Sequence, residues 1–190
     1  MPRNYMFTKE QVLAAAIELT REKGFAAVSA RSLGEKLGTT SRPIFSHFEN
    51  MADVQRGIIC AANRLYQSFR KEETASGKYV PYKASGTAYI RFAKEEKELF
   101  KLLFMRDRSG EIREDPEEMD ALIGLIAKQV GIDKETAKIF YLEMWAYTHG
   151  IAVMIATNYL DWDEEFISRA LTDAYEGLKY RYKNGGVCND

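Results

Sequence analysis

The sequence predicts an all-α protein of 190 residues. Apolar residues recur at spacings of three and four along almost the whole chain, which is the pattern of amphipathic helices. Only four prolines, at positions 2, 43, 81 and 116, interrupt this pattern. No stretch alternates polar and apolar residues as a half-buried strand does. Hydrophobic residues make up 46% of the chain, which is enough apolar material for a packed core and excludes a disordered protein.

Charge and cysteine content exclude several classes of protein. The 27 Lys and Arg residues nearly balance 28 Asp and Glu residues, so the whole chain is not a basic nucleic-acid coat. Two cysteines, Cys60 and Cys188, and two histidines do not make a disulfide scaffold or a strong zinc framework, and we expect no metal and no cofactor. We expect Cys60 to be buried as a small apolar residue.

No membrane segment or signal peptide is expected. The longest apolar runs, such as 151–156, are far shorter than the roughly 20 residues that span a bilayer. The N-terminus lacks the apolar region of a signal peptide. We therefore expect a cytoplasmic protein with no membrane partner.

The first helix is expected to begin near Thr8 and to stop at Gly24. Thr8 and Gln11 have the spacing of a capping box. Glycine is the residue most often found just after a helix, because it adopts the left-handed conformation there without strain. One apolar stripe follows the start of this helix, formed by Val12, Ala15, Ala16 and Leu19.

A second helix is expected from the N-cap Ser29 to Leu37, before Gly38. A third, short helix is expected to follow Thr40 and to end near Phe48. Pro43 is compatible with this third helix, because the first turn of a helix contains N–H groups that have no intrahelical partner in any case.

A long helix is expected to begin near Met51 and to end at Ser76-Gly77. Further helices are expected over the ranges 82–93, 95–106, 116–130, 134–160 and 163–183.

Charge is distributed unevenly between the two ends of the chain. Residues 1–48 hold 7 Lys/Arg and 4 Asp/Glu, whereas residues 133–190 hold 6 and 10, so the net charges are +3 and −4. Together with the predicted elements, this asymmetry indicates two domains, 1–49 and 50–190.

Residues 29–48 have the layout of a helix-turn-helix. Leu33 and Leu37 on its first helix, with Ile44 and Phe48 on its second, supply the apolar contacts that hold the two together. The remaining face carries hydroxyls and cations but no carboxylate, and such a face can approach a polyanion closely. Its residues are Thr39, Thr40, Ser41, Arg42, Ser46 and His47.

Residues 7–58 resemble the N-terminal domain of the TetR family of bacterial transcriptional regulators. Four motifs carry the resemblance in the family's order and spacing: Ala-Ala-Ala-Ile-Glu-Leu at 14–19, Arg-Glu-Lys-Gly-Phe at 21–25, Ser-Leu-Gly-Glu-Lys-Leu-Gly at 32–38, and Ile-Phe-Ser-His-Phe at 44–48. The run Trp-Ala-Tyr-Thr-His-Gly at 145–150 is similar to a Trp…His-Gly signature of one group of TetR-type C-terminal domains.

The sequence departs from the family pattern in three places. Phe45 stands where the family usually has Tyr, so no hydroxyl is offered to a phosphate there. Asn50-Met51-Ala52 replaces the usual Ser-Lys-Glu, which removes a lysine typical of phosphate binding. Gly34 replaces the usual Ala and is expected to weaken the second helix slightly.

The resemblance implies a sequence-specific regulator rather than an enzyme. It implies a homodimer on a palindromic double-stranded DNA operator, most often as a repressor released by a small-molecule effector. The DNA-binding residues expected on this basis are Ser29, Arg31, Thr39, Thr40, Ser41, Arg42, Pro43, Ser46 and His47. Arg42 is the first candidate for reading a base, because an arginine fork matches the edge of guanine. Phe45 and Phe48 are expected in the core, with DNA contact as the alternative for Phe45.

An aromatic face in the C-terminal half is a candidate ligand site. Tyr141, Trp145 and His149 share one helix face, which fits either a buried stripe or the wall of a pocket for an amphipathic ligand. Phe100, Phe104 and Met105 are candidates for the same cavity.

The last two helices carry a candidate dimer seam; the other interpretation is packing of the same two helices inside one chain, and both can hold together. The residues of this seam are Ile151, Ile155, Ala170, Leu171, Ala174 and Leu178.

A different function class remains open at this point, namely a small-molecule-binding or catalytic helical protein without specific DNA binding. The basic, hydroxyl-rich N-terminal unit favours the regulator, and no residues have the spacing of a catalytic triad. An activator fits the sequence as well as a repressor does.

Overall fold

The computed structural model describes residues 6–107 and 116–184. Within these residues the chain forms helices and no strand, so the predicted all-α fold is confirmed. The α-helices are α1 (Lys9–Lys23), α2 (Ala30–Lys36), α3 (Met51–Ala75), α4 (Pro81–Glu95), α5 (Lys97–Phe104), α6 (Pro116–Val130), α7 (Lys134–Ala156) and α8 (Glu164–Asn184). Two short 3₁₀ helices, η1 (Phe25–Ala27) and η2 (Ile44–Ser46), complete the described elements.

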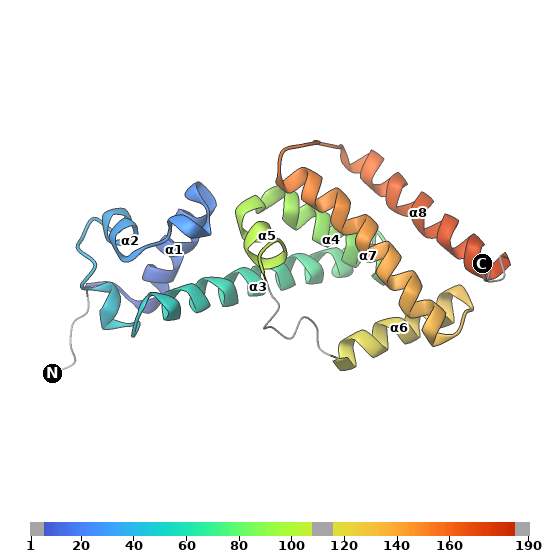
Figure 1. Cartoon of the computed structure of the whole chain (residues 1–190), viewed down its shortest axis with the longest axis horizontal. Coiled ribbons are helices and arrows are strands. Elements are labelled where there is room, and N and C mark those ends of the chain that lie inside the picture. Colours follow the sequence, from blue (N-terminus) through green and yellow to red (C-terminus); the bar gives the residue numbers. More distant parts are fainter. Residues whose placement is uncertain (1–5, 108–115, 185–190) are drawn as a thin grey trace.

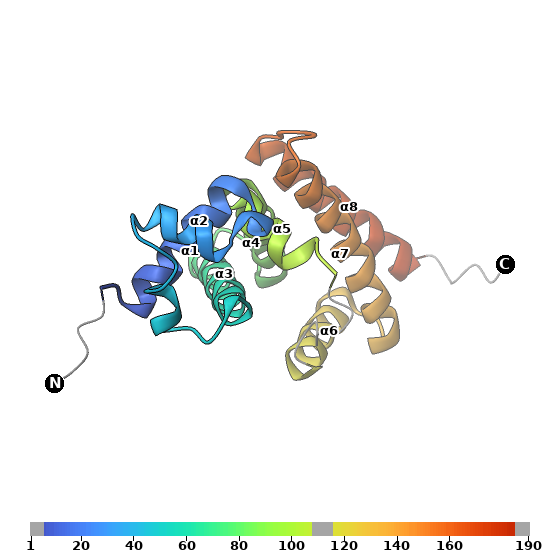
Figure 2. The ribbon, with the colours of Figure 1, turned by 60° about the vertical axis from the view of Figure 1, so that its left-hand side comes forward.

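The long helix α3 runs from the end of the molecule that holds α1 and α2 toward its middle, where α4 and α5 lie (Figure 1). We call the unit formed by α1, α2, η2 and the start of α3 the head. The far part of α3 packs against α4, and α4 packs against α7. Figure 2 shows α7 between α6 and α8, at the end of the molecule away from the head. The region formed by α4 to α8 is called the body below.

Capping residues begin the head helices where the sequence predicts. The Thr8 hydroxyl accepts a hydrogen bond from the Gln11 backbone N–H, and the Gln11 side chain accepts one from the Thr8 N–H. Ser29 and Ser32 make the same reciprocal pair at the start of α2. Gly24 ends α1 with φ of 80°, a value that other residues adopt only with strain.

The core of the head extends into α3. Val12 and Leu19 of α1, Leu33 of α2 and Ile44 of η2 are almost completely buried in one cluster. Val54 and Ile58 of α3 lie in the same cluster, although they follow the expected domain boundary between 49 and 50. That boundary remains a prediction, and the packing joins the start of α3 to the head.

The prediction of an α-helix from Thr40 to Phe48 is wrong. The Ile44 N–H donates to the carbonyl of Ser41, 3.2 Å away, and the Ser46 N–H donates to that of Pro43, also at 3.2 Å. These bonds join residues three apart, so the segment is a tighter 3₁₀ turn. Pro43 has no backbone N–H and cannot donate a hydrogen bond. The segment is also too short for the remaining hydrogen bonds between residues four apart to stabilise an α-helix.

Helix α7 ends at Ala156, four residues before the predicted end at 160. Asn158 turns the chain with φ of 57°, and the Tyr159 N–H donates back to the carbonyl of Met154 at 2.9 Å. Helix α7 is the one helix of the described residues that is long and apolar enough to cross a membrane, with a mean hydropathy of 1.2. In the fold it packs against α4, α6 and α8, and 39% of this apolar stretch is buried.

Candidate DNA interface and ligand pocket

The segment 39–47 presents a polar surface over a buried apolar base; we call it the recognition segment. Thr40, Arg42 and Ser46 are exposed, while Ile44 is completely buried beneath them. Arg42 makes no ion pair with any residue of 6–107 or 116–184. A guanidinium in this position is available for a phosphate or a base edge.

Arg31 and Ser29, at the start of α2, are engaged in local contacts. The Arg31 Nε lies 3.0 Å from Glu35 Oε1, and both side chains are largely exposed. Such an exposed pair is weak and exchanges readily for another anion. The Ser29 hydroxyl accepts the Ser32 N–H at 3.1 Å and so contributes to the start of α2.

His47 binds the chain just before α1. Its Nε2 lies 2.6 Å from the carbonyl oxygen of Phe7. A carbonyl can only accept, so Nε2 carries the proton in this contact. Sequence reasoning placed His47 on a phosphate; here it is half-buried and holds the recognition segment against the start of the head.

Two residues expected in the core are exposed. Phe48 is buried as predicted, but Phe45 is 43% exposed on the recognition segment, because the 3₁₀ turn directs Ile44 rather than Phe45 inward. This outcome agrees with the alternative position of Phe45 at the surface. Cys60 is exposed on α3, which corrects the prediction that it is buried.

Gly34 allows the recognition segment to lie close to α2. A Cβ at this position would be 3.0 Å from the Thr39 carbonyl oxygen and 3.0 Å from the Thr40 carbonyl carbon. The Thr39 N–H also donates to the Gly34 carbonyl at 2.9 Å. The sequence indicated only a weaker helix here, and the contact that requires glycine was not predicted because it depends on the path of the turn.

A pocket of about 630 Å³ lies between α3 and the helices α4, α5, α6, α7 and α8 of the body. This volume is within the range of sites for small organic ligands. Aromatic side chains dominate its wall, with Tyr66, Tyr82, Tyr89, Phe104, Tyr141, Trp145 and Tyr175 all contributing. Whether the space is open or filled by the core was undecided from sequence, and the structure shows it open.

Three of the six predicted ligand residues line the pocket: Phe104, Tyr141 and Trp145. Phe100 is completely buried in the core, and Met105 is 41% exposed outside the pocket. Met105 follows the last residue of α5, so its side chain leaves the face that Phe104 shares with the pocket. The lining residues of α3 and α4 were missed, because the helical pattern alone does not show which of their faces meets the cavity.

His149 lies behind the wall rather than on it. Its Nδ1 is 2.8 Å from the hydroxyl of Tyr89, and its ring stacks on Trp145 with centroids 4.9 Å apart and planes at 6°. Burial lowers the pKa of His149 below its usual value, so the ring is neutral at neutral pH. His149 therefore orients two pocket residues, Tyr89 and Trp145, without carrying charge into the site.

The hydroxyl of Tyr82 in the pocket remains protonated. Burial raises the pKa of Tyr82 well above its ordinary value, and the neighbouring Tyr141 and Tyr175 raise it further. A protonated phenol can donate or accept a hydrogen bond. Tyr82 is therefore a neutral polar point in a wall that also includes the cations Lys78 and Lys83.

Comparison with known proteins assigns both parts of the chain. Residues 12–56 match the model for bacterial regulatory proteins of the tetR family, and residues 82–175 match that for a tetracyclin repressor-like C-terminal domain. The chain belongs to the TetR family. It is a DNA-binding transcriptional regulator with a helix-turn-helix, not an enzyme.

Curated relatives of this TetR-family regulator cover most of its length. It is 25% identical to the uncharacterized HTH-type transcriptional regulator YvkB of Bacillus subtilis (strain 168), over 74% of this chain and 80% of the relative. It is 21% identical to the uncharacterized HTH-type transcriptional regulator Rv0681 of Mycobacterium tuberculosis, over 96% of this chain and 86% of the relative.

The predicted dimer seam of this TetR-family regulator lies largely inside its own chain. Ile151, Ile155 and Leu171 are buried in the core of the body, and Ala170 is buried as well. Ala174 and Leu178 are partly buried against the cluster around Phe140. This is the intramolecular alternative left open by the sequence. Helix α7 also exposes four large apolar residues, Ile139, Leu142, Trp145 and Tyr147, of which Trp145 lines the pocket.

Proposed function

We propose that this TetR-family regulator represses transcription in the cytoplasm as a homodimer on a palindromic operator, and that a small molecule in the body pocket releases it. One observation carries the proposal: helix α5 contributes both to the core of the head and to the pocket. Leu102 of α5 packs in the head cluster, and Phe104 of the same helix lines the pocket.

The proposed DNA contacts are of two kinds: contacts with base edges, which read the sequence, and contacts with the DNA backbone, which position the protein. Arg42 is proposed to read a base, because it is exposed and free of ion pairs with the described residues. Ser29, Arg31, Thr39, Thr40, Ser41, Pro43 and Ser46 are proposed to contact the backbone, with His47 holding the segment in place. Phe45 joins this set as an exposed apolar contact.

The proposed dimer uses the outer faces of α7 and α8. Large apolar side chains are exposed on both helices, Ile139 and Leu142 on α7 and Phe166 and Tyr180 on α8. Exposed apolar groups that gather in this way are typical of an interaction surface. Pairing these faces around a two-fold axis buries them and sets the spacing of the two heads. Two helices from each subunit then form a four-helix bundle.

The proposed release mechanism follows from α5. A ligand against Phe104 favours a position of α5 that differs from the one in the empty pocket, and Leu102 transfers this shift to the head. Because the operator accepts one spacing of the heads, a small shift of each lowers affinity for DNA.

The test is a fluorescence anisotropy titration of the purified protein against DNA fragments from beside its own gene, at two salt concentrations and with unrelated DNA as competitor. We expect selective binding by two subunits per site that weakens steeply with salt, because each neutralised phosphate releases a counterion. A selection from random DNA sequences covers an operator that lies elsewhere. If neither experiment gives selective binding, the proposed repressor on a palindromic operator is excluded.

A further inference from the structure

The pocket has an excess of positive charge. Among the described residues, its lining includes the cations Lys78 and Lys83 and the carboxylate Glu176; Arg70 also lines it but is engaged in other contacts, among them one with Gln67. The Glu176 carboxylate lies 3.0 Å from Lys179, so its charge is already compensated. An anionic ligand group is favoured in such a site and a cationic one is not.

Lys83 is the cation best placed for a ligand. It is half-buried, and its ammonium donates to the hydroxyls of Ser168, at 3.0 Å, and Thr172, at 2.8 Å. It also lies over the ring of Tyr79, with Nζ 4.7 Å from the centroid. Lys83 makes no ion pair with any carboxylate of the described residues. Neutral partners orient this charge without cancelling it.

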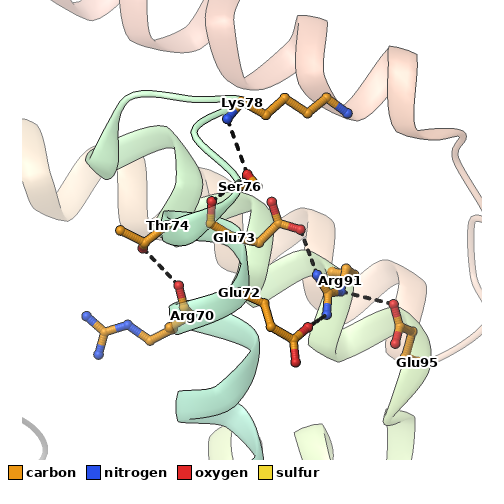
Figure 3. A network of polar contacts seen from close by, with 8 residues as sticks. All are labelled: Arg70, Glu72, Glu73, Thr74, Ser76, Lys78, Arg91 and Glu95. Carbon is orange, nitrogen blue, oxygen red and sulfur yellow. Dashed lines mark hydrogen bonds and ion pairs between the residues drawn. The ribbon is translucent and has the colours of Figure 1, made fainter.

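Two carboxylates at the adjacent end of α3, Glu72 and Glu73, are paired with Arg91, as is Glu95 at the end of α4. Arg91 lies 2.6 Å from Glu72, 2.8 Å from Glu73 and 3.1 Å from Glu95, and Figure 3 shows the three carboxylates around its guanidinium. These acids therefore compensate Arg91 and leave the charge of Lys83 for a ligand.

The rest of the wall suits an apolar body. Trp145, Phe104 and Met144 offer apolar surface, and the hydroxyls of Tyr66 and Tyr141 belong to side chains that also line the space. Pockets of this composition bury flat or aliphatic groups and orient them by a few polar contacts.

We propose that the effector is an amphipathic monoanion, with an aromatic or aliphatic body in the pocket and an acidic group paired with Lys83. This inference rests on the proposed function only in naming the ligand an effector. The acidic group competes with Ser168 and Thr172 for the ammonium, so the contact between α4 and α8 changes when the ligand binds.

The test uses two fluorescent probes that share a ring system. The first, 1-anilinonaphthalene-8-sulfonate, carries an anionic sulfonate; the second, N-phenyl-1-naphthylamine, lacks it. Each is titrated into the full-length protein and into Lys83→Met. We expect the variant to lose about tenfold in affinity for the sulfonate, since it loses a charge-assisted hydrogen bond, and less than about twofold for the neutral probe.

Two further variants control the result. Lys71→Met removes the same charge from an exposed position of α3 outside the pocket, and we expect less than about twofold change for either probe. Gly86→Leu places a side chain in the pocket, because a Cβ there already meets Thr148 at 3.8 Å and Leu171 at 3.9 Å. It should weaken both probes.

The proposal is overturned if Lys83→Met loses the same factor of affinity for both probes. It is also overturned if the affinity for the sulfonate probe is unchanged in either Lys83→Met or Gly86→Leu. DNA titration of the same samples separates the two levels of inference. If the protein binds an operator but Lys83→Met does not change its affinity for the sulfonate probe, the proposal of an anionic effector is rejected and the proposal of a repressor stands. If anion binding depends on Lys83 but the protein does not bind DNA selectively, the proposal of a repressor is rejected and the proposed anion site stands.

Discussion

Arg21 in α1 holds Glu96, the residue between α4 and α5, through two hydrogen bonds. The Arg21 Nε lies 2.8 Å from Glu96 Oε2 and its Nη2 lies 2.6 Å from Glu96 Oε1. A fork of this kind fixes direction as well as distance. The head is therefore joined to the body by an oriented ion pair beside the apolar contact of Leu102.

Replacing Arg21 with Met should weaken this joint. The Glu96 side chain is only 14% exposed, so the variant leaves a mostly buried carboxylate without its partner, at a cost of about 1 kcal/mol in the free energy of unfolding. Urea unfolding measures this loss. We also expect a smaller ligand-induced drop in DNA affinity, because the head follows α5 less closely.

Lys134→Met is the matched control for Arg21→Met, since the pair of Lys134 with Asp120 is exposed on both sides and lies outside the proposed DNA contacts. Its free energy of unfolding should change by no more than about 0.5 kcal/mol. Equal stability of Arg21→Met and the unmodified protein, with an undiminished ligand response, would show that the ion pair does not couple head and body.

Gly34→Ala should destabilise the head, although alanine is the better helix former. The new Cβ meets backbone atoms of Thr39 and Thr40 at 3.0 Å, and backbone cannot move aside as a flexible side chain does. We expect a loss of about 1 kcal/mol in thermal unfolding and weaker operator binding.

Gly124→Ala is the comparison for Gly34→Ala, because a Cβ at Gly124 of α6 meets nothing within 4 Å. It should gain up to about 1 kcal/mol from helix propensity alone. If Gly34→Ala is stabilised by a similar amount, the close approach of the recognition segment to α2 is wrong.

The contrast between these glycines illustrates what the sequence predicts and what it does not. The starts of α1 and α2 depend on contacts three residues apart, Thr8 with Gln11 and Ser29 with Ser32, so these two starts were predicted correctly. The recognition segment depends on contact between the turn and Gly34, which no local pattern contains. A regular helix was therefore expected where a 3₁₀ turn forms.

The pocket was predicted in part for the same reason. Helical spacing placed Tyr141 and Trp145 on one face, and both line the cavity. Lys83 and Tyr82 lie on α4, a helix that contacts α3, α5, α7 and α8, so its periodicity does not distinguish a face toward a neighbour from one toward the pocket. Packing decides that difference.

Leu142→Glu should convert the proposed dimer into a monomer. Leu142 is 51% exposed on the outer face of α7, so a carboxylate there is tolerated in a single chain but is desolvated without a partner in an isologous interface. Sedimentation analysis measures the change. Leu125→Glu places the same charge on α6 and should remain a dimer; a dimeric Leu142→Glu would exclude this face.

His149 should make stability depend on pH. Burial lowers its folded-state pKa below the value of about 6.5 in the unfolded chain, so the unfolded state binds more protons below that pH. The contribution is present in full above about pH 6.5 and decreases as the pH falls toward the folded-state pKa. Urea unfolding at about pH 8 and about pH 5.5 should therefore show a larger loss for the unmodified protein than for His149→Gln. Parallel losses would mean that His149 does not titrate differently in the two states.

Arg42→Ala tests the proposed reading of DNA directly. If Arg42 contacts a base edge, the variant loses about 1–3 kcal/mol of discrimination, so affinity for the operator falls much more than affinity for unrelated DNA. Loss of a phosphate contact alone would instead weaken both by a similar factor and reduce the salt dependence. Arg64→Ala removes an exposed arginine from the middle of α3, outside the recognition segment, and controls for the general effect of charge. Arg42→Ala with the same operator affinity and selectivity as Arg64→Ala would exclude Arg42 as a reader of the sequence.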